Sequence, residues 1–397
     1  MKKLLFAFAI LSTLFVACDK EDDKKEDDKK DNELKGDITD VKELDASIEY
    51  TLSGSLSIKD GGKLMIPAGT VIKAEIGFDK YILVETGGQI FAEGTAEAPV
   101  TFMSAAADAK AGYWGGIIIN GKAKVSGADA SGSNQGSTEI DGTIKYGGND
   151  DTDNSGVLTY IKLFHTGAKV DAETEHNGLT LNGVGNGTKI ENLYIAEGAD
   201  DGVEWFGGSV NVKNLLVVNS QDDMFDVTQG WTGTLDNAYG IWEEPFFTDE
   251  GDPRGIEADG NLDGKGNDHI DQSDFKMKNV SIVVNASKVD DKTFMHDAVK
   301  IRRGAKATIT NCLVWNIKGE VKDLVDVVDK RGGATNDSNI EITFKGIDYI
   351  GNDVTRSTTS EDGDSEITSD AVVTISDSNT GADVSAFAWT GYAFPKM

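Results

Sequence analysis

The residues best suited to chemistry in this chain are acidic and recur at a fixed spacing. Residues 190–233 contain two aligned copies of 22 residues, which place Glu204 opposite Asp226. Two further copies of the same short motif place Glu257 and Lys300 at this position. Neighbouring carboxylates can bind a hard cation, or they can divide the acid and base roles of glycoside hydrolysis. If the chain is an enzyme, the candidate catalytic residues are Glu204, Asp226, Glu257, Lys300 and Arg302.

A second acidic pattern lies in the turn before each of these positions. Asp200 and Asp201 align with Asp222 and Asp223, so stacked copies would carry a dense acidic strip on one face. Two unit charges about 4–5 Å apart repel by several kcal/mol at an effective dielectric constant of about 20, and by about 1 kcal/mol in open water. The strip is therefore either a hydrated ladder of turns, in which aspartates bond backbone amides, or a site for a cation or a glycan.

A separate loop has the spacing of a calcium-binding turn. The sequence from Asp259 to Gly264 fits the pattern D-x-[DN]-x-D-G, which places three oxygen-bearing side chains and a bending glycine around a hard cation. An EF-hand would have glutamate at the position of Ile270, so this loop is not one. We predict calcium here, and a hydrated turn is the alternative. The predicted ligands are Asp259, Asn261, Asp263 and Asp268, with Asp271 as another possible source of the last carboxylate.

The stretches that must position these residues are short, β-branched and alternating, with no helical periodicity. A unit of 22 residues built from such strands predicts an all-β fold, a right-handed parallel β-helix, in which each coil bonds to the next at about 4.8 Å. A propeller is the alternative, but each of its blades needs roughly 40–50 residues. Alternation predicts these inward-facing residues: Val203, Trp205, Phe225, Val227, Ile256, Val299 and Ile301.

Several motifs carry a resemblance to a known group of proteins. Pro67–Ile72, Gly87–Thr95 and Trp114–Ile118 resemble the opening coils of bacterial surface β-helix proteins, and Asp200–Gly208 looks similar to lipoproteins of the same group. The chain thus resembles Bacteroidetes-type surface lipoproteins with a right-handed parallel β-helix body. That group has no agreed activity, so the resemblance implies the fold and the lipoprotein type and transfers no catalytic residues.

The first eighteen residues form a predicted lipoprotein signal. Lys2 and Lys3 precede an apolar stretch that is too short to span a bilayer and ends at Ala17 and Cys18. This ending resembles a bacterial lipobox, although Phe15 stands where the pattern usually has leucine. An ordinary secretory signal is the alternative. We predict that Cys18 is acylated and anchors the protein in the outer membrane.

These patterns divide the chain into three regions. We expect a signal peptide over 1–17, an acylated cysteine with a charged flexible tether over 18–40, and a single β-helix domain over 41–397. The acidic residues directly after the cysteine resemble a surface-export signal, so we expect the lipid-anchored protein to face the cell exterior. Loop insertions are expected near 124–156 and 237–272. An aromatic C-terminal cap over the open end of the coil would contain Phe387, Trp389, Tyr392 and Phe394.

Composition and missing motifs narrow the function. The chain has 38 Lys+Arg against 68 Asp+Glu and a formal net charge of −30, which argues against a nucleic-acid partner. It lacks the P-loop, the G-x-S-x-G motif and the H-E-x-x-H motif. We predict a non-catalytic surface module that binds a glycan or another macromolecule, such as a surface protein. Loop aromatics that could stack on sugar rings, or instead pack loops onto the coil, are Trp114, Trp231, Trp242, Phe246 and Phe247.

The alternative function is degradation of a polysaccharide. A glycoside hydrolase would use the stacked carboxylates, whose separation across one or two coils brackets the distances that such enzymes need. A lyase would use calcium to neutralise a uronate and Lys300 or Arg302 as the base. This alternative rests on analogy with other β-helix proteins, and the net charge of −30 disfavours anionic substrates unless calcium bridges them.

Replacing Cys18 with alanine tests the predicted lipid anchor. We expect Cys18→Ala protein to leave the membrane fraction and to be soluble or to keep its signal peptide, because no other apolar stretch approaches membrane-spanning length. Fractionation of the producing cells, followed by immunoblotting, measures the outcome. Retention of the variant in the outer-membrane fraction would contradict the prediction.

Overall fold

The part of the chain that carries the candidate site forms one compact unit, Glu33–Met397. The predicted signal peptide, Cys18 and most of the predicted tether lie outside the described residues. In the part of the chain that is described, no helix is long and apolar enough to cross a membrane. The structure, a computed structural model, describes residues 32–170, 174–266, 268–289 and 293–396.

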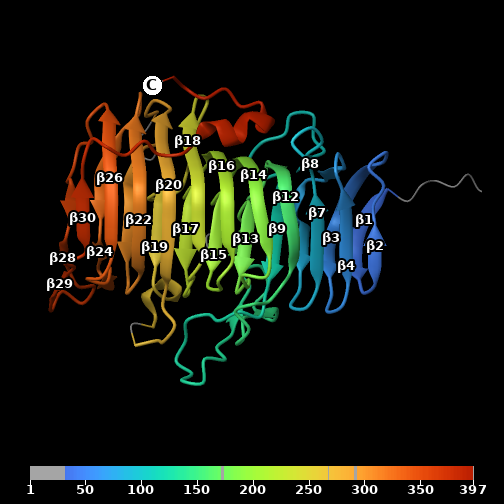
Figure 1. Ribbon diagram of the computed structural model, residues 1–397, viewed down its shortest axis with the longest axis horizontal. Coiled ribbons are helices and arrows are strands. Elements are labelled where there is room, and N and C mark those ends of the chain that lie inside the picture. Colours follow the sequence, from blue (N-terminus) through green and yellow to red (C-terminus); the bar gives the residue numbers. More distant parts are fainter. Residues whose placement is uncertain (1–31, 171–173, 267, 290–292, 397) are drawn as a thin grey trace, which may run out of the picture. The chain divides into compact units, whose positions relative to one another are not determined.

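The strands wind into a parallel β-helix, which confirms the predicted fold class (Figure 1). Each coil contributes to three faces, which we call A, B and C, and its strands pair in parallel with those of the coils before and after it. Face A carries the candidate site. Its strands are β6 (Gly77–Val84), β9 (Trp114–Asn120), β13 (Leu179–Asn182), β15 (Val203–Phe206), β17 (Phe225–Thr228), β19 (Ile256–Asp259), β21 (Met295–Arg302), β23 (Val321–Asp326) and β27 (Val354–Thr355).

Faces B and C are built partly from separate short strands and partly from long strands that bend from one face to the next. The short strands are β2 (Val41–Glu43), β4 (Lys63–Pro67), β7 (Gln89–Glu93) and β30 (Val372–Ile375) on face B, and β5 (Val71–Ala74) and β8 (Val100–Ser104) on face C. The bent strands are β1 (Glu33–Ile38), β3 (Glu49–Ile58), β12 (Gly156–Phe164), β14 (Lys189–Gly198), β16 (Asn211–Ser220), β18 (Thr234–Glu243), β20 (Asp274–Asn285), β22 (Lys306–Asn316) and β26 (Asn339–Gly346). Of these, β1 and β3 bend from face C to face A, since β3 pairs first with β5 and then with β6, and the others bend from face B to face C.

The remaining elements lie in turns and insertions. They are β10 (Gly136–Ser137), β11 (Lys145–Tyr146), η1 (Leu262–Gly264), β24 (Val328–Asp329), β25 (Gly332–Gly333), β28 (Ser357–Thr359), β29 (Glu366–Thr368) and η2 (Val384–Thr390).

Asparagines make the corner between faces B and C. Asn192, Asn214 and Asn237 occupy equivalent places in β14, β16 and β18 with φ of 61°, 56° and 66°. Asparagine tolerates this left-handed conformation better than most residues, so the strand can bend there. Asn214 Nδ2 donates to Asn192 Oδ1 (2.8 Å) and Asn237 Nδ2 donates to Asn214 Oδ1 (2.9 Å). These bonds join successive coils and hold their register at the corner.

The interior is packed by the residues that alternation predicted to face inward. All seven are fully buried, including Trp205 and Phe225. The rings of Trp205 and Trp231 stack with their centroids 4.8 Å apart, and Phe275 continues this stack at 5.6 Å from Trp231. Because inward residues alternate with outward residues along each strand, the buried stack also determines which side chains of face A point outward.

The boundaries of the domain differ from the predicted ones. β1 begins at Glu33, inside the predicted 18–40 tether. Leu34 and Ile38 are buried in the core, and this burial offsets the loss of conformational entropy when the segment becomes ordered. The insertion expected near 237–272 is interrupted, since β18 continues to Glu243 and β19 contributes a further coil. The inserted loops are therefore 121–155, 244–255 and 260–273.

The C-terminal segment does not cover the open end of the coil, so this part of the prediction was wrong. η2 lies along the side of the β-helix against β14 and β16 (Figure 1). It buries Phe387 against outward-facing apolar residues such as Leu216 and Ile241, which water would otherwise contact. Lys162 Nζ donates to Thr390 O (3.1 Å) and Tyr392 Oη donates to Glu243 Oε2 (2.7 Å), which fixes the segment in place.

Candidate functional site

The predicted acidic strip stacks on face A in the predicted register. Glu204 of β15 pairs with Asp226 of β17, Asp226 pairs with Glu257 of β19, and Glu257 pairs with Lys300 of β21. The ladder continues to Asp326 of β23. Because the pairing is parallel and in register, each carboxylate meets the next one at the spacing of neighbouring strands, about 4.8 Å.

The strip is enclosed: Glu204 is buried, and Asp226 and Glu257 are half-buried. Glu204 is only 8% exposed. The inserted loops enclose this part of face A: Glu139 of the 121–155 loop and Asp252 and Arg254 of the 244–255 loop line a cavity of about 180 Å³ together with the strip. Ten carboxylates line this cavity against two guanidinium groups, Arg254 and Arg302.

The 121–155 loop is held over the cavity by a small core of its own. Val125 and Tyr146 pack against Phe206, which is an outward-facing residue at the end of β15. The Tyr146 hydroxyl also donates a hydrogen bond to Gln229 Oε1 (2.5 Å). Phe206 follows Glu204 by two residues, so the strand that presents the carboxylate also anchors the loop that encloses it.

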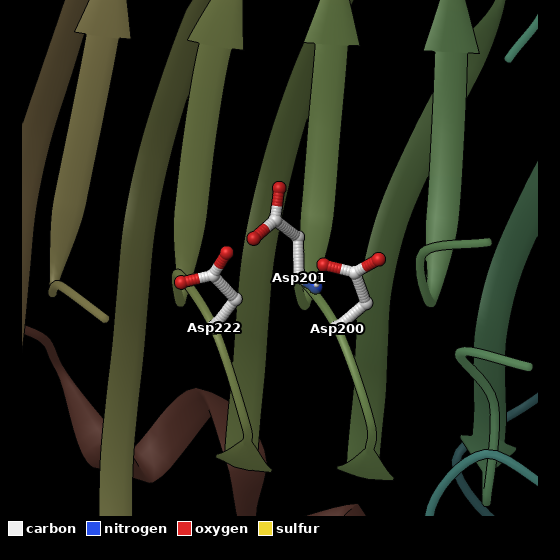
Figure 2. Close-up of side chains that lie close together, drawn as sticks. All are labelled: Asp200, Asp201 and Asp222. Carbon is white, nitrogen blue, oxygen red and sulfur yellow. Dashed lines mark hydrogen bonds between the residues drawn. The ribbon is translucent and has the colours of Figure 1, made fainter. Parts of the chain in front are cut away.

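Seven carboxylates form the centre of the cavity, and we call them the acidic cluster. They make three overlapping groups whose oxygens lie within 4.8 Å of one another, so each group could hold a metal ion. Asp201 belongs to two of these groups and Asp226 to two. Figure 2 shows one group, in which Asp200 and Asp201 from one turn lie beside Asp222 from the next. The acidic cluster consists of Asp200, Asp201, Glu204, Asp222, Asp223, Asp226 and Glu257.

Hydrogen bonds satisfy some oxygens of the acidic cluster and leave others without a donor. Asn177 Nδ2 donates to Glu204 Oε2 (2.6 Å), and the backbone N–H of Asp223 donates to Asp201 Oδ1 (2.8 Å). In contrast, Asp222 Oδ1 and Asp226 Oδ1 are shielded from solvent and receive no hydrogen bond from any described N–H or hydroxyl group. A buried oxygen without a partner is destabilising, so either a proton on a neighbouring carboxyl group or a bound cation would stabilise these two atoms.

Burial raises the pKa of the central carboxyls, because a charge in a poorly hydrated cavity is destabilised. The pKa values of Asp201 and Glu204 lie well above their usual range, first because of burial and then because of charges such as those of Asp226 and Glu139. Burial, followed by the charge of Glu257, raises the pKa of Asp222 to about 8. Without a cation, Asp222 therefore holds a proton at neutral pH.

The other predicted site residues form ion pairs with neighbouring side chains. Arg302 contacts Glu257 and also bonds Asp259 through Nε (2.7 Å), and Glu257 additionally pairs with Arg254 Nη1 (2.5 Å). Lys300 Nζ lies 2.5 Å from Asp326 Oδ2. The strip is thus divided into two parts: Glu204 and Asp226 face other carboxylates, whereas Glu257, Lys300 and Arg302 belong to a network of alternating charges.

The predicted calcium loop is also part of this network, because Asp259, its first predicted ligand, is paired with arginine. Both Asp259 oxygens accept hydrogen bonds from arginine, one from Arg302 Nε and the other from Arg303 Nη1 (2.8 Å). Asn261 Oδ1 accepts the N–H of Gly266 (2.9 Å). Guanidinium groups thus occupy the place that the motif assigned to a cation. Asp268 is exposed, and the side chain of Asp263 lies outside the described structure.

The architecture of the chain is that of a known family. The family of the pectate-lyase-like β-helix domain matches residues 36–392. The chain belongs to this family. Comparisons with curated proteins and with solved structures found no match. Membership of this family agrees with the stacked faces of the β-helix, but it does not establish an activity.

Several cavity residues were not predicted from the sequence. Arg254 occupies the position that Asp223 has one coil earlier, since the N–H of Met224 bonds to Arg254 O. Extending the aligned sequence motif by two residues toward its N-terminal side could have revealed Arg254. Asn177 lies in the turn one coil before Asp201, since the N–H of Gly178 bonds to Asp201 O. Glu139 and Asp252 come from insertions without a counterpart in other coils, so no repeat could reveal them.

Four of the five aromatics that were expected to stack on sugar rings are packed in the interior core of the β-helix instead. Trp114, Trp231, Trp242 and Phe246 are buried. Among these five aromatics Phe247 alone is exposed, at 54%. Trp242 stacks on Phe246 with ring centroids 4.6 Å apart, which anchors the start of the 244–255 loop.

The raised carboxyl pKa values predict that stability without metal falls as pH rises. The pKa of Asp222 in the folded protein is about 8, above its unfolded value near 4, so its stabilising contribution is complete below about pH 4 and is lost as pH rises through about 8. In chelator, we expect the melting temperature to fall by a few degrees between about pH 7 and about pH 8.5, a range in which histidines contribute little. Thermal unfolding in Asp222→Asn protein should show a flatter profile. A melting temperature that stays constant or rises in the unmodified protein would contradict this account.

Proposed function

We propose that this pectate-lyase-like β-helix is a non-catalytic glycan-binding module in which calcium completes the acidic cluster. One observation carries the proposal. Asp222 Oδ1 and Asp226 Oδ1 are buried without a hydrogen-bond donor, in a cavity where carboxylates far outnumber cationic groups. A divalent cation bound at a group that contains one of these oxygens would satisfy that oxygen and offset the repulsion between its neighbours.

The geometry suits calcium better than magnesium. Oxygens that share an ion at about 2.4 Å can lie no more than about 4.8 Å apart, and the three groups of the acidic cluster meet this condition. Calcium accepts six to eight oxygens in flexible arrangements, whereas magnesium prefers a strict octahedron and keeps several waters. Asp201, Glu204 and Asp226 form the central group, and we assign the ion to them. When bound, it would supply a positive charge that can also accept hydroxyl or carboxylate oxygens of a sugar.

The sizes of two neighbouring cavities favour binding over catalysis. The acidic cavity, at about 180 Å³, has room for about six waters, which suits a hydrated cation better than a sugar ring flanked by catalytic groups. A larger groove of about 730 Å³ lies next to it and shares Asp252, Arg254 and Arg302 with it. This volume falls in the usual range of ligand pockets. In the proposed arrangement the cation sits in the small cavity and the glycan lies in the groove.

Glycoside hydrolysis is the second candidate, and one observation favours it. The pKa values of Glu204 and Asp226 are both raised, and a hydrogen bond joins the two side chains when one of them is protonated, so two coupled carboxyl groups lie side by side. Such a pair is typical of glycosidases. A lyase is less well supported, because both basic candidates, Lys300 and Arg302, are buried in ion pairs.

The proposed location remains the outer membrane, with the protein facing the cell exterior through acylated Cys18. The signal-like N-terminus and its resemblance to surface lipoproteins support this proposal. A rigid β-helix at the end of a charged tether would present face A to extracellular glycans or to a surface protein. The Cys18→Ala fractionation tests the anchor separately from the site.

Calcium should stabilise the protein through Asp226. We expect calcium at a hundredfold excess over its Kd to raise the free energy of unfolding by about 2.7 kcal/mol. Asp226→Asn protein should respond much less to calcium, and in chelator it should be at least as stable as the unmodified protein, because one buried repulsion is removed. Thermal unfolding with and without calcium measures both effects. The matched control is Asp108→Asn, which removes an exposed charge elsewhere on the molecule and should keep the full calcium response.

A glycan array with a product assay on each hit then separates the two candidate functions. Binding that depends on calcium and yields no product supports the module, whereas turnover of a bound glycan selects the hydrolase. Equal melting temperatures in chelator and in millimolar calcium would overturn the cation site. If Asp226→Asn protein fails to fold, the carboxylate of Asp226 forms a stabilising pair that the structure does not contain.

A further inference from the structure

The two ends of the β-helix differ in how well their apolar residues are covered. In the first coil, the inward-facing Leu34 and Ile38 of β1 are 0% and 6% exposed. β30 lies at the opposite end of the ribbon from β1 and β2 (Figure 1). There Ile375 stands beside the fully buried Ile342 of β26 and faces inward as Ile342 does, yet it is 43% exposed. The interior of the β-helix thus reaches the surface at its C-terminal end.

The last strands also lack a strand partner on their outer edge. Among the strands that the structure describes, β30 pairs with β26 alone and β27 pairs with β23 alone. The chain does not return to cover this edge. It passes to the side of the β-helix, where the N–H of Asn379 donates to Thr343 Oγ1 (3.0 Å) and the N–H of Thr380 donates to Asn311 Oδ1 (2.7 Å). An open edge of this kind is a template on which another strand can pair.

The same end carries a high density of negative charge. Residues 347–377 contain eight aspartates and glutamates against one basic residue, Arg356, a formal net charge of −7. This is about three times the average charge density of the chain. Asp370 and Asp377, which are both exposed, stand on either side of β30. Equal charges beside an open edge oppose pairing between two copies of one chain, whereas they attract a strand of opposite charge.

We propose that an extended cationic segment of a partner protein binds at this end as an added strand beside β30. We call the surface formed by β27, β30 and residues 347–350 the open end. Its free strand edge supplies backbone hydrogen bonds, its exposed core supplies apolar contacts, and its aspartates supply ion pairs with lysine or arginine. Ile347 and Ile350, which are 51% and 67% exposed, add to the apolar surface.

A second copy of this chain is a poorer occupant of the open end. It would bring another charge of −7 to the same place, and equal charges across an interface are destabilising. A cationic strand instead neutralises the aspartates that flank β30. The open end shares no residue with the acidic cluster, so this inference goes beyond the proposed glycan-binding function and does not depend on it.

The test uses three synthetic peptides as probes. The first, Lys-Arg-Val-Thr-Val-Thr-Val-Arg-Lys, alternates in the manner of a strand and has cationic ends. The second has glutamate in place of each lysine and arginine, and the third has proline in place of each valine. Fluorescence anisotropy with labelled peptides measures their affinity for the full protein. We expect the first peptide to bind, and the other two to bind at least about tenfold more weakly, because one has the wrong charge and the other lacks N–H groups for strand pairing.

Two double variants locate the site. Asp370→Asn/Asp377→Asn removes the charges beside β30, and Asp40→Asn/Glu43→Gln removes two exposed charges at the other end of the β-helix. We expect affinity for the first peptide to fall by about three- to tenfold in the former, because two exposed ion pairs are lost, and to stay unchanged in the latter. Hydrogen–deuterium exchange should show slower exchange of the β30 amides when the first peptide binds.

Several results would overturn the inference. They are no binding of the first peptide, equal binding of the glutamate or proline peptide, equal affinity of the two double variants, and protection from exchange at other strands but not at β30. Light scattering of the unmodified protein gives its mass in solution. Dimers that dissociate in Ile375→Lys protein would show that a second copy occupies the open end, which also contradicts the proposal.

Discussion

In-register parallel pairing places equivalent residues of successive coils about 4.8 Å apart, and the candidate site depends on this constraint. An acidic residue repeated at an outward position of face A necessarily meets its counterpart, as Glu204 meets Asp226 and Asp226 meets Glu257. In open water such contacts cost about 1 kcal/mol each and are tolerated. Here the inserted loops enclose them, so the same contacts require protons or a cation.

The charge pattern changes along face A, and this change organises the surface into two parts. Toward β15 and β17, carboxylates face carboxylates, and buried oxygens of Asp222 and Asp226 lack donors. From β19 onward, arginines and lysines alternate with acids, as in the pairs of Arg302 with Asp259 and Lys300 with Asp326. The two parts meet at Arg254 and Arg302, which line both the acidic cavity and the larger groove beside it. In the proposed arrangement, a ligand lying along the face contacts the cation of the acidic cluster at one end and protein cations at the other.

The repeats in the sequence predicted the fold and the register because a solenoid converts period into spatial alignment. They placed Trp205 inward and Glu204 outward, and both positions are confirmed. They could not predict that Glu204 is buried, since the residues that enclose it, Glu139 and Asp252, belong to insertions with no repeat. The ion pairs of Asp259 escaped prediction for a related reason: local spacing does not show that Arg302 and Arg303 arrive from the next coil.

The central claim is that a divalent cation completes the acidic cluster, and an anomalous difference map tests it most directly. A crystal of the protein grown in calcium should show a peak at about 2.3–2.6 Å from carboxylate oxygens of Asp201, Glu204 and Asp226. A well-ordered cluster without such a peak at saturating calcium, with its carboxyl groups bonded to one another or to water, would contradict the account. In that case protons alone would balance the buried charge.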